Sequence, residues 1–322
     1  MYIGRLAPSP TGALHLGNVR TFMIAWLRAR SQRGRVIFRM EDLDHPKDKP
    51  GAAQAAVEDL RWLGFDWDEE YVQSERKAIY RSAIDFLHGR GAVYPCVCSR
   101  RDVESAQSAP HDGEQLFYPG TCRGRFASWE EAVRFRRQAG SSAPPCWRFA
   151  VAPETVVTFD DVFAGRFTQE VSRTLGDFPV ARDEGGAGYT LACTVDDLLM
   201  GVTEVIRGDD LLAATPAQLL LARALVPWLA ERQPSAVPPA YCHVPLVVGP
   251  DGRRLAKRHG DTRIASFRAA GWRPERVLGL LAASCGWASP DEELSLAGLL
   301  ARFDLSVIPK SKAVLFVNPP RF

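Results

Sequence analysis

Residues 7–18 read APSPTGALHLGN, and this stretch sets the fold expected for the first part of the chain. Its Pro, Ser and Gly residues predict a turn. Residues 2–6 before it are a short strand candidate, and apolar residues after it recur at helical spacing, at Val19, Phe22, Met23, Trp26 and Leu27. The unpaired amides at a helix N-terminus attract anions. The stretch is therefore a candidate phosphate-binding loop, although alone it would more often be a plain strand–helix turn.

The residues after this loop continue the alternation of predicted strands and helices. Residues 35–40 (RVIFRM) predict a second strand, and residues 50–63 and 74–91 predict helices. Strand candidates return at 189–195, 204–207 and 243–248, with a helix over 217–225. Strands that alternate with helices are typical of a parallel sheet. We therefore expect an α/β fold.

The middle of the chain lacks this alternation of strands and helices. Residues 105–114 and 140–145 are polar and turn-rich, and short strand-like runs surround Val156 and Phe167. The segment after residue 264 is helical, over 274–283 and 296–303. We expect a catalytic domain of residues 1–90 and 186–263, an inserted module of 91–185, and a helical C-terminal region of 264–322.

Composition places the chain among soluble globular proteins. Of its 322 residues, 46% are hydrophobic and 24% are charged, and the formal net charge of +2 does not by itself indicate a nucleic-acid-binding protein. Apolar runs such as 277–283 are far shorter than a membrane span, and the N-terminus has no secretory pattern. We expect a cytoplasmic protein, a monomer, with no membrane association.

Three of the seven cysteines lie close together in the sequence. Cys96, Cys98 and Cys122 suggest a metal site, because thiols in a reducing compartment seldom form disulfides. The isolated cysteines are expected to be small buried apolar residues, namely Cys146, Cys193, Cys242 and Cys285.

Residues 7–18, with Val19, Arg20 and Thr21, resemble the nucleotide-binding "HIGH" signature of class I aminoacyl-tRNA synthetases of the glutamyl type. The resemblance implies a Rossmann-type parallel-sheet domain that binds ATP with Mg²⁺. His15 would be catalytic, and asparagine replaces the second signature histidine. The implied ATP-binding residues of this loop are Pro8, Gly12, His15, Gly17 and Asn18.

A second motif, RLAKRHG at residues 254–260, resembles the mobile "KMSKS" loop of the same class. A flexible lysine there can neutralise the triphosphate while the adenylate forms. The resemblance makes Lys257 catalytic, and alanine replaces the usual serine. The implied ATP-binding residues of this motif are Arg254, Leu255, Ala256 and Lys257.

The resemblance also implies an L-glutamate pocket. Glutamate needs cations for its carboxylates and a carboxylate for its ammonium group, and an arginine offers a bidentate fork to a carboxylate. The positions that match the family's glutamate-binding residues are Arg5, Ser9, Glu41, Tyr189 and Arg207.

A structural zinc ion is implied for the inserted module. The short glutamyl-Q tRNA(Asp) synthetases carry C-x-C followed by Y-x-x-x-C, which Cys96, Cys98, Tyr118 and Cys122 match. Tyrosine is then the fourth ligand. His111 remains a rival fourth ligand, and loss of the zinc site remains open.

The resemblance to this short family covers nearly the whole chain. It implies that the chain has no anticodon-binding domain, that residues 264–322 are stem-contact-like, and that glutamate is transferred to queuosine in the anticodon loop of tRNA(Asp). The alternatives are a truncated glutamyl-tRNA synthetase that charges a 3′ end, a non-catalytic module that binds glutamate or tRNA, and another adenylate-forming ligase.

Overall fold

Parallel strands form the centre of the computed structural model, which describes residues 1–43, 48–105, 117–182, 186–249 and 261–314. Strands β1 (Ile3–Leu6), β2 (Arg35–Met40) and β3 (Glu69–Val72) pair in that order, all parallel. A second parallel pair joins β9 (Glu204–Gly208) to β10 (Ala240–Val244). The two groups meet where the amide of Thr203 donates to the carbonyl of Ile3 at 2.9 Å.

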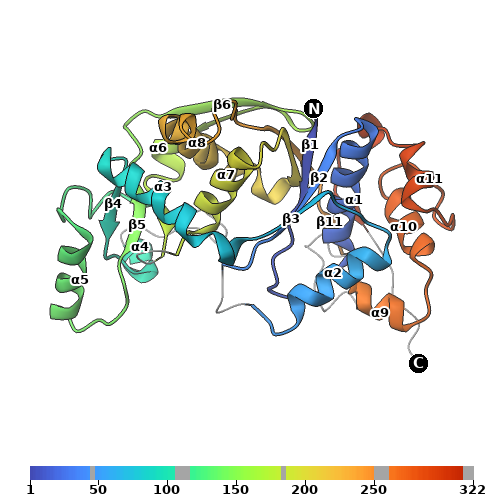
Figure 1. The fold of residues 1–322 in the computed structure, drawn as a ribbon, viewed down its shortest axis with the longest axis horizontal. Helices are drawn as coiled ribbons and strands as arrows, with labels where there is room; N and C mark the ends of the chain where they lie inside the picture. Colours follow the sequence, from blue (N-terminus) through green and yellow to red (C-terminus); the bar gives the residue numbers. More distant parts are fainter. Residues whose placement is uncertain (44–47, 106–116, 183–185, 250–260, 315–322) are drawn as a thin grey trace.

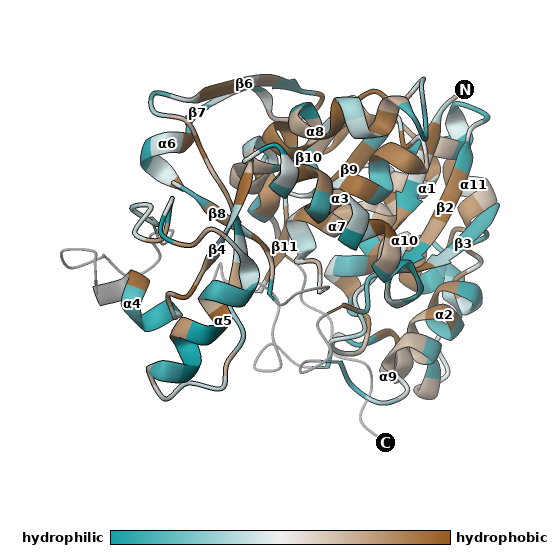
Figure 2. Cartoon of the chain, turned by 60° about the vertical axis from the view of Figure 1, so that its left-hand side comes forward, coloured by the Kyte–Doolittle hydropathy of each residue, from teal (hydrophilic) through white to brown (hydrophobic). Residues whose placement is uncertain are grey.

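Helices cover these strands in two hydrophobic clusters. One cluster joins α1 (Leu16–Ser31) and α2 (Ala52–Trp62) to β1 and β2. The other joins α3 (Lys77–Gly89), α7 (Tyr189–Leu199) and α8 (Thr215–Ala230). Short 3₁₀ helices precede α3 and α8, as η1 (Gln73–Arg76) and η2 (Asp209–Ala214). Figure 2 shows hydrophobic stretches in β2 and β9, and both strands also contain buried charged residues, Arg39 and Arg207 among them.

The described residues between 91 and 182 form an antiparallel layer at the left of Figure 1, and its buried side chains join the cluster of α3, α7 and α8. Strand β5 (Cys146–Phe149) lies between β4 (Val93–Cys96) and β8 (Phe178–Ala181). A hairpin of β6 (Val156–Asp161) and β7 (Gly165–Glu170) extends back over α8, and the amide of Val162 donates to the carbonyl of Tyr241 beside β10. The helices of this layer are α4 (Arg100–Ser105), α5 (Trp129–Gln138) and α6 (Val171–Thr174).

The C-terminal helices lie at the opposite end, beside α1 and α2 (Figure 1). They are α9 (Ile264–Ala269), α10 (Pro274–Ala283) and α11 (Leu296–Leu300), followed by the 3₁₀ turn η4 (Leu305–Val307). The predicted helical region also contains a strand, because β12 (Ala313–Val314) pairs in parallel with β11 (Val247–Val248).

One predicted strand is wrong. Residues 189–195 lie in helix α7, where the buried residues Leu191, Val195 and Leu198 recur at helical spacing behind Gly188 at the N-cap. A short apolar run does not distinguish a buried helix from a buried strand, and here the helix extends four residues further. The predicted strand 243–248 is divided at Pro245 into β10 and β11, and the acidic strand β3 was not predicted.

By length and composition alone, one described segment is apolar enough to cross a membrane, namely residues 209–230. This differs from the sequence-based expectation. Half of its apolar window is buried inside the protein, and α8 packs in the core beside α3 and α7. Burial against other helices accounts for its apolar character as a core helix.

Candidate functional site

A cavity of about 820 Å³ opens beyond the carboxyl ends of β1, β2 and β9. In open sheets with parallel strands, ligands bind at this edge. The cavity brings together every described residue that the sequence proposed for glutamate or ATP: Arg5, Pro8, Ser9, Gly12, His15, Gly17, Asn18, Glu41, Tyr189 and Arg207.

The loop at one wall of the cavity ends in a capping box. His15 is the N-cap of α1, and its Nδ1 accepts a hydrogen bond from the amide of Gly17 at 3.2 Å. Oδ1 of Asn18 accepts from the amide of His15 at 3.3 Å. A Cβ on residue 17 would lie 3.1 Å from the His15 ring, so a side chain there would press against that ring. Asn18 therefore has a structural role in forming the start of α1.

The segments on either side of the second motif contact this loop. The amide of Leu16 donates to the carbonyl of Thr262, and the amide of Ile264 donates to the carbonyl of Leu14. Leu246 and Val247 line the cavity. The motif residues themselves, Arg254, Leu255, Ala256 and Lys257, lie outside the described residues, as does His111.

A buried ion network holds Glu41. Arg39 donates to Glu41 at 3.0 Å and to Asp197 at 2.7 Å, and the Cys193 thiol donates to the same Glu41 oxygen at 3.1 Å. Burial opposes the charge on Arg39, but Asp197 and Glu41 outweigh burial and raise its pKa well above the ordinary value. Oε2 of Glu41 accepts no hydrogen bond from the described residues, and Glu41 lines the cavity. That oxygen is available to a cation.

Arg5 is held close to the same network. Its guanidinium donates to the carbonyl of Ile206 at 3.0 Å and lies 3.6 Å from Asp197. The charge of Asp197 is thus shared between Arg5 and Arg39. This arrangement fixes Arg5 at the carboxyl end of β1 while part of its positive charge still faces the cavity.

Arg207 has a different environment. It is 5% exposed, and its hydrogen-bond partners are all uncharged: His243 at 3.0 Å, Thr215 at 2.8 Å, and Tyr189 and the Leu211 carbonyl at 3.5 Å. Among the residues the structure describes, no carboxylate forms an ion pair with it. A buried cation of this kind favours an anionic ligand.

Sequence reasoning missed several residues that support this site. His243 was assigned only to a buried strand, and Asp161, Thr215 and Cys193 were given no role at the site. A histidine inside the apolar run 243–248 was the one available signal, because a buried imidazole needs hydrogen-bond partners.

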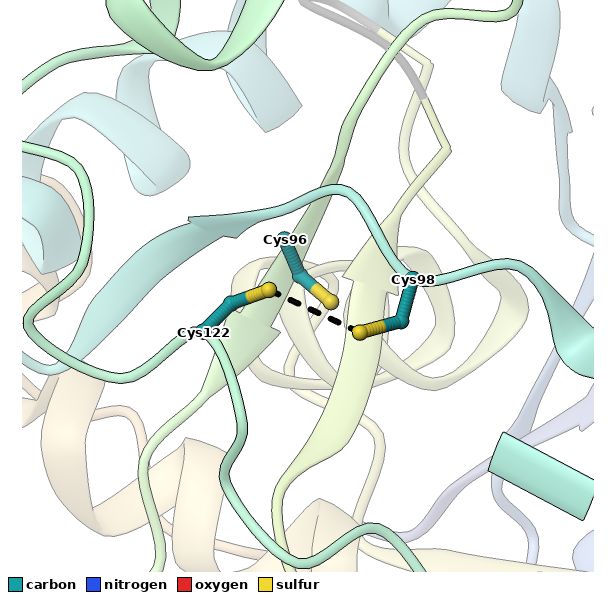
Figure 3. A group of neighbouring side chains, drawn as sticks. All are labelled: Cys96, Cys98 and Cys122. Carbon is teal, nitrogen blue, oxygen red and sulfur yellow. Dashed lines mark hydrogen bonds between the residues drawn. The ribbon is translucent and has the colours of Figure 1, made fainter. Parts of the chain in front are cut away.

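A second site lies in the inserted layer, where three cysteine sulfurs lie within 4.8 Å of one another (Figure 3). Cys96 ends β4, and Sγ of Cys98 is 3.6 Å from Sγ of Cys122. Zinc at about 2.3 Å from each sulfur of a tetrahedral site requires sulfurs about 3.8 Å apart. The cluster therefore has the spacing of a metal site.

Tyr118 completes a group of four donors. Its phenol oxygen lies 3.3 Å from the sulfur of Cys96 and 3.6 Å from that of Cys98. The Tyr118 backbone bridges to Gly176, whose φ of +62° and close contact with the Tyr118 carbonyl exclude a side chain. Hydrogen bonding to Cys96 raises the pKa of Cys122 to about 12, so a metal would bind with release of protons. This donor set fits zinc.

The isolated cysteines are buried except one. Cys193, Cys242 and Cys285 are buried as expected, whereas Cys146 is only partly buried. Cys146 stands opposite Cys96 in the β4–β5 register, next to the metal-type cluster.

The chain is similar to known proteins along most of its length. Residues 3–315 match the family model of "tRNA synthetases class I (E and Q), catalytic domain". A glutamyl-Q tRNA(Asp) synthetase of Symbiobacterium thermophilum is 46% identical, over 96% of this chain and 94% of that protein. One from Rhodopirellula baltica is 45% identical, over 91% and 87%. A crystal structure of a glutamate tRNA ligase from Elizabethkingia meningosepticum, in complex with its amino acid, has a TM-score of 0.77 at 26% identity, covering 98% of this chain and 67% of that one.

Proposed function

Because the chain belongs to the class I tRNA synthetases of the E and Q type and is a ligase, we propose that it activates L-glutamate with ATP and transfers it to queuosine in the anticodon loop of tRNA(Asp). The relatives named for that reaction are 45–46% identical to this chain. The observation that carries the proposal is the cavity that combines Arg5, Arg207 and Glu41 with the N-terminus of α1.

The amino acid would be bound by complementary charges. Arg207 or Arg5 offers a guanidinium fork to a glutamate carboxylate, with Tyr189 and Ser9 as polar neighbours. Oε2 of Glu41 receives the ammonium group. The cationic and anionic partners then hold the reacting carboxylate in a fixed orientation, which favours reaction by positioning.

ATP, bound with Mg²⁺, would occupy the wall formed by residues 8–18. The loop residues that line the cavity would face its phosphates, and glycines 12 and 17 allow close approach of the backbone. The α-carboxylate oxygen of glutamate attacks the α-phosphorus, and the bond to pyrophosphate breaks. His15 and Lys257 stabilise the charge that develops on the phosphates.

In the second step, a hydroxyl of the queuosine cyclopentene ring attacks the carbonyl carbon of the mixed anhydride. AMP leaves, and an ester forms between glutamate and the tRNA.

We propose that Zn²⁺ held by Cys96, Cys98, Tyr118 and Cys122 keeps the inserted module folded and takes no part in the chemistry. We also propose a cytoplasmic monomer.

Glutamate-dependent pyrophosphate exchange without tRNA tests activation. Transfer is tested with labelled glutamate, ATP, Mg²⁺, and tRNA prepared with or without queuosine. Label only on the queuosine-containing tRNA, in the anticodon-loop fragment after nuclease cleavage, is the expected result. Label on the 3′ fragment of both preparations would show a glutamyl-tRNA synthetase instead. Binding of glutamate or tRNA without exchange, whether or not tRNA is present, would show a non-catalytic binder.

A further inference from the structure

The charge on Arg207 is supported without direct contact with a carboxylate. Its Nε donates to Nε2 of His243 at 3.0 Å, and NH2 donates to the hydroxyl of Thr215 at 2.8 Å. NH1 has only the Tyr189 hydroxyl, at a long 3.5 Å. The Nε edge of the guanidinium is thus held firmly, while NH1 remains available at the cavity.

The contact between Arg207 and His243 fixes the proton on the imidazole. Arginine N–H groups always donate, so Nε2 of His243 must offer its lone pair, and the ring proton must lie on Nδ1. Nδ1 is 2.6 Å from Oδ2 of Asp161, which accepts that proton in a hydrogen bond. Both side chains are fully buried. Asp161 therefore selects the tautomer that Arg207 requires.

Asp161 is itself fixed by backbone amides. Its Oδ1 accepts from the amides of His243 and Phe163 at 3.0 Å and of Ala164 at 2.8 Å. These contacts close the turn of the β6–β7 hairpin, which belongs to residues 91–185. The inserted segment thus supplies the Asp161 carboxylate, which acts through His243 on Arg207, a cavity residue on β9.

The neutral imidazole of His243 lies between Asp161 and Arg207 and so keeps the carboxylate away from the Arg207 N–H groups. A carboxylate paired directly with Arg207 would compete with a substrate carboxylate for the same N–H groups. Asp161 acts from one residue further away, so it stabilises the buried cation and leaves part of the fork unpaired.

We propose that Asp161 and His243 are positioning residues that orient Arg207 to bind a carboxylate of the amino-acid substrate. This inference rests on the proposed activation of glutamate and adds residues that set affinity for the amino acid. We expect this pair of residues to affect glutamate binding and not ATP binding. The described contacts of Asp161 and His243 connect them to Arg207 and not to the loop of residues 8–18.

The test uses isosteric substitutions. In Asp161→Asn, the new amide N–H donates to Nδ1 of His243, which moves the ring proton to Nε2, opposite the N–H of Arg207. The KM for glutamate in pyrophosphate exchange should rise about 10-fold to 100-fold, as expected for loss of one charge-assisted hydrogen bond. The KM for ATP should change less than about twofold. Asp160→Asn, on the neighbouring exposed residue of the same strand, is the matched control.

A second pair of variants separates positioning from general stability. His243→Asn retains a donor for Asp161 but loses the acceptor for Arg207, whereas His243→Gln offers an amide oxygen near the Nε2 position. The Asn variant should show the large rise in the KM for glutamate, and the Gln variant should recover at least part of the loss. Should Asp161→Asn fail to fold, this pair carries the same test.

Glutamate binding to the wild-type chain, measured by calorimetry, distinguishes failure of the positioning role from failure of the proposed activation of glutamate. If the wild type binds glutamate and Asp161→Asn and His243→Asn both match Asp160→Asn in the KM for glutamate, the positioning role is refuted while activation stands. If the wild type neither binds glutamate nor catalyses exchange, the proposed function fails, and the positioning role fails with it.

Discussion

One carboxylate oxygen of Glu41, the residue after β2, accepts a hydrogen bond at 3.0 Å from Arg39 near the end of that strand, while the other oxygen has no partner among the described residues. Arg39 and the thiol of Cys193 thus fix the orientation of a carboxylate that lines the cavity. A fixed carboxylate binds a cation without the entropic cost of ordering its own side chain.

This arrangement predicts the effect of Glu41→Gln. The amide cannot pair with the ammonium group by charge, so the KM for glutamate in pyrophosphate exchange should rise about 10-fold to 100-fold, the range for one hydrogen bond to a charged group. Glu58→Gln, on the exposed face of α2, should leave it unchanged. An unchanged KM in Glu41→Gln, with a cooperative melting transition, would exclude Glu41 from the amino-acid site.

The cysteine cluster predicts one zinc ion per chain. Cys98→Ser should lose that ion and lower the melting temperature, because a structural zinc contributes its binding energy to folding. Metal analysis of protein purified without chelators is the measurement. Cys285→Ala, in the core far along the sequence, should retain the zinc. A wild-type protein that contains no zinc, and takes up none when zinc is supplied, would contradict the assignment.

The fourth ligand is decided by a separate pair of variants. Tyr118→Phe removes the phenol oxygen that lies 3.3 Å from Cys96, so it should weaken zinc retention against a chelator. His111→Ala should leave retention unchanged. The opposite result would make His111 the fourth ligand.

Lys257 is expected to act on the chemical step. Lys257→Ala should reduce the kcat of pyrophosphate exchange about 100-fold to 1000-fold, as is typical when one group that stabilises a transition-state charge is removed. The KM for glutamate should change little. Lys77→Ala, which removes an exposed lysine at the start of α3, is the control. A fall in affinity for glutamate without loss of kcat would assign Lys257 to amino-acid binding.

The free energy of unfolding should fall as the pH is lowered through two ranges, one set by His243 and one by Asp161. Burial lowers the pKa of His243 below its ordinary value, so the unfolded chain takes up a proton first, and stability is lost from about pH 6.5 downward. Burial opposes the charge on Asp161, but hydrogen bonds from His243 and from the Ala164 amide outweigh it and lower its pKa. That contribution is lost as the pH falls from about 3.9 through the folded-state pKa.

Melting temperatures measured between pH 8 and pH 5 in buffers of matched ionic strength, about 0.15 M, test the first range. His243→Gln should flatten the slope between about pH 6.5 and pH 5, because its amide does not titrate. An equal slope in the wild type and in this variant would show that other groups cause the acid sensitivity.

The sequence alone determined the local features of this protein. The run of residues 7–18 required a turn and a helix start, residues 35–40 form strand β2 as predicted, and the spacing of Cys96, Cys98 and Cys122 identified a metal-type cluster. These features depend on neighbours in the chain. The assignments to glutamate, ATP and queuosine came from resemblance and stay predictions for the individual residues.

Only the tertiary structure decided the long-range partnerships. Residues 189–195 form a helix because α3 and α8 bury their apolar face. Asp197 meets Arg39 across 158 positions of the chain, and Asp161 meets His243 across 82. No local pattern encodes such contacts, because buried charges are tolerated only when distant elements bring their partners within hydrogen-bonding distance.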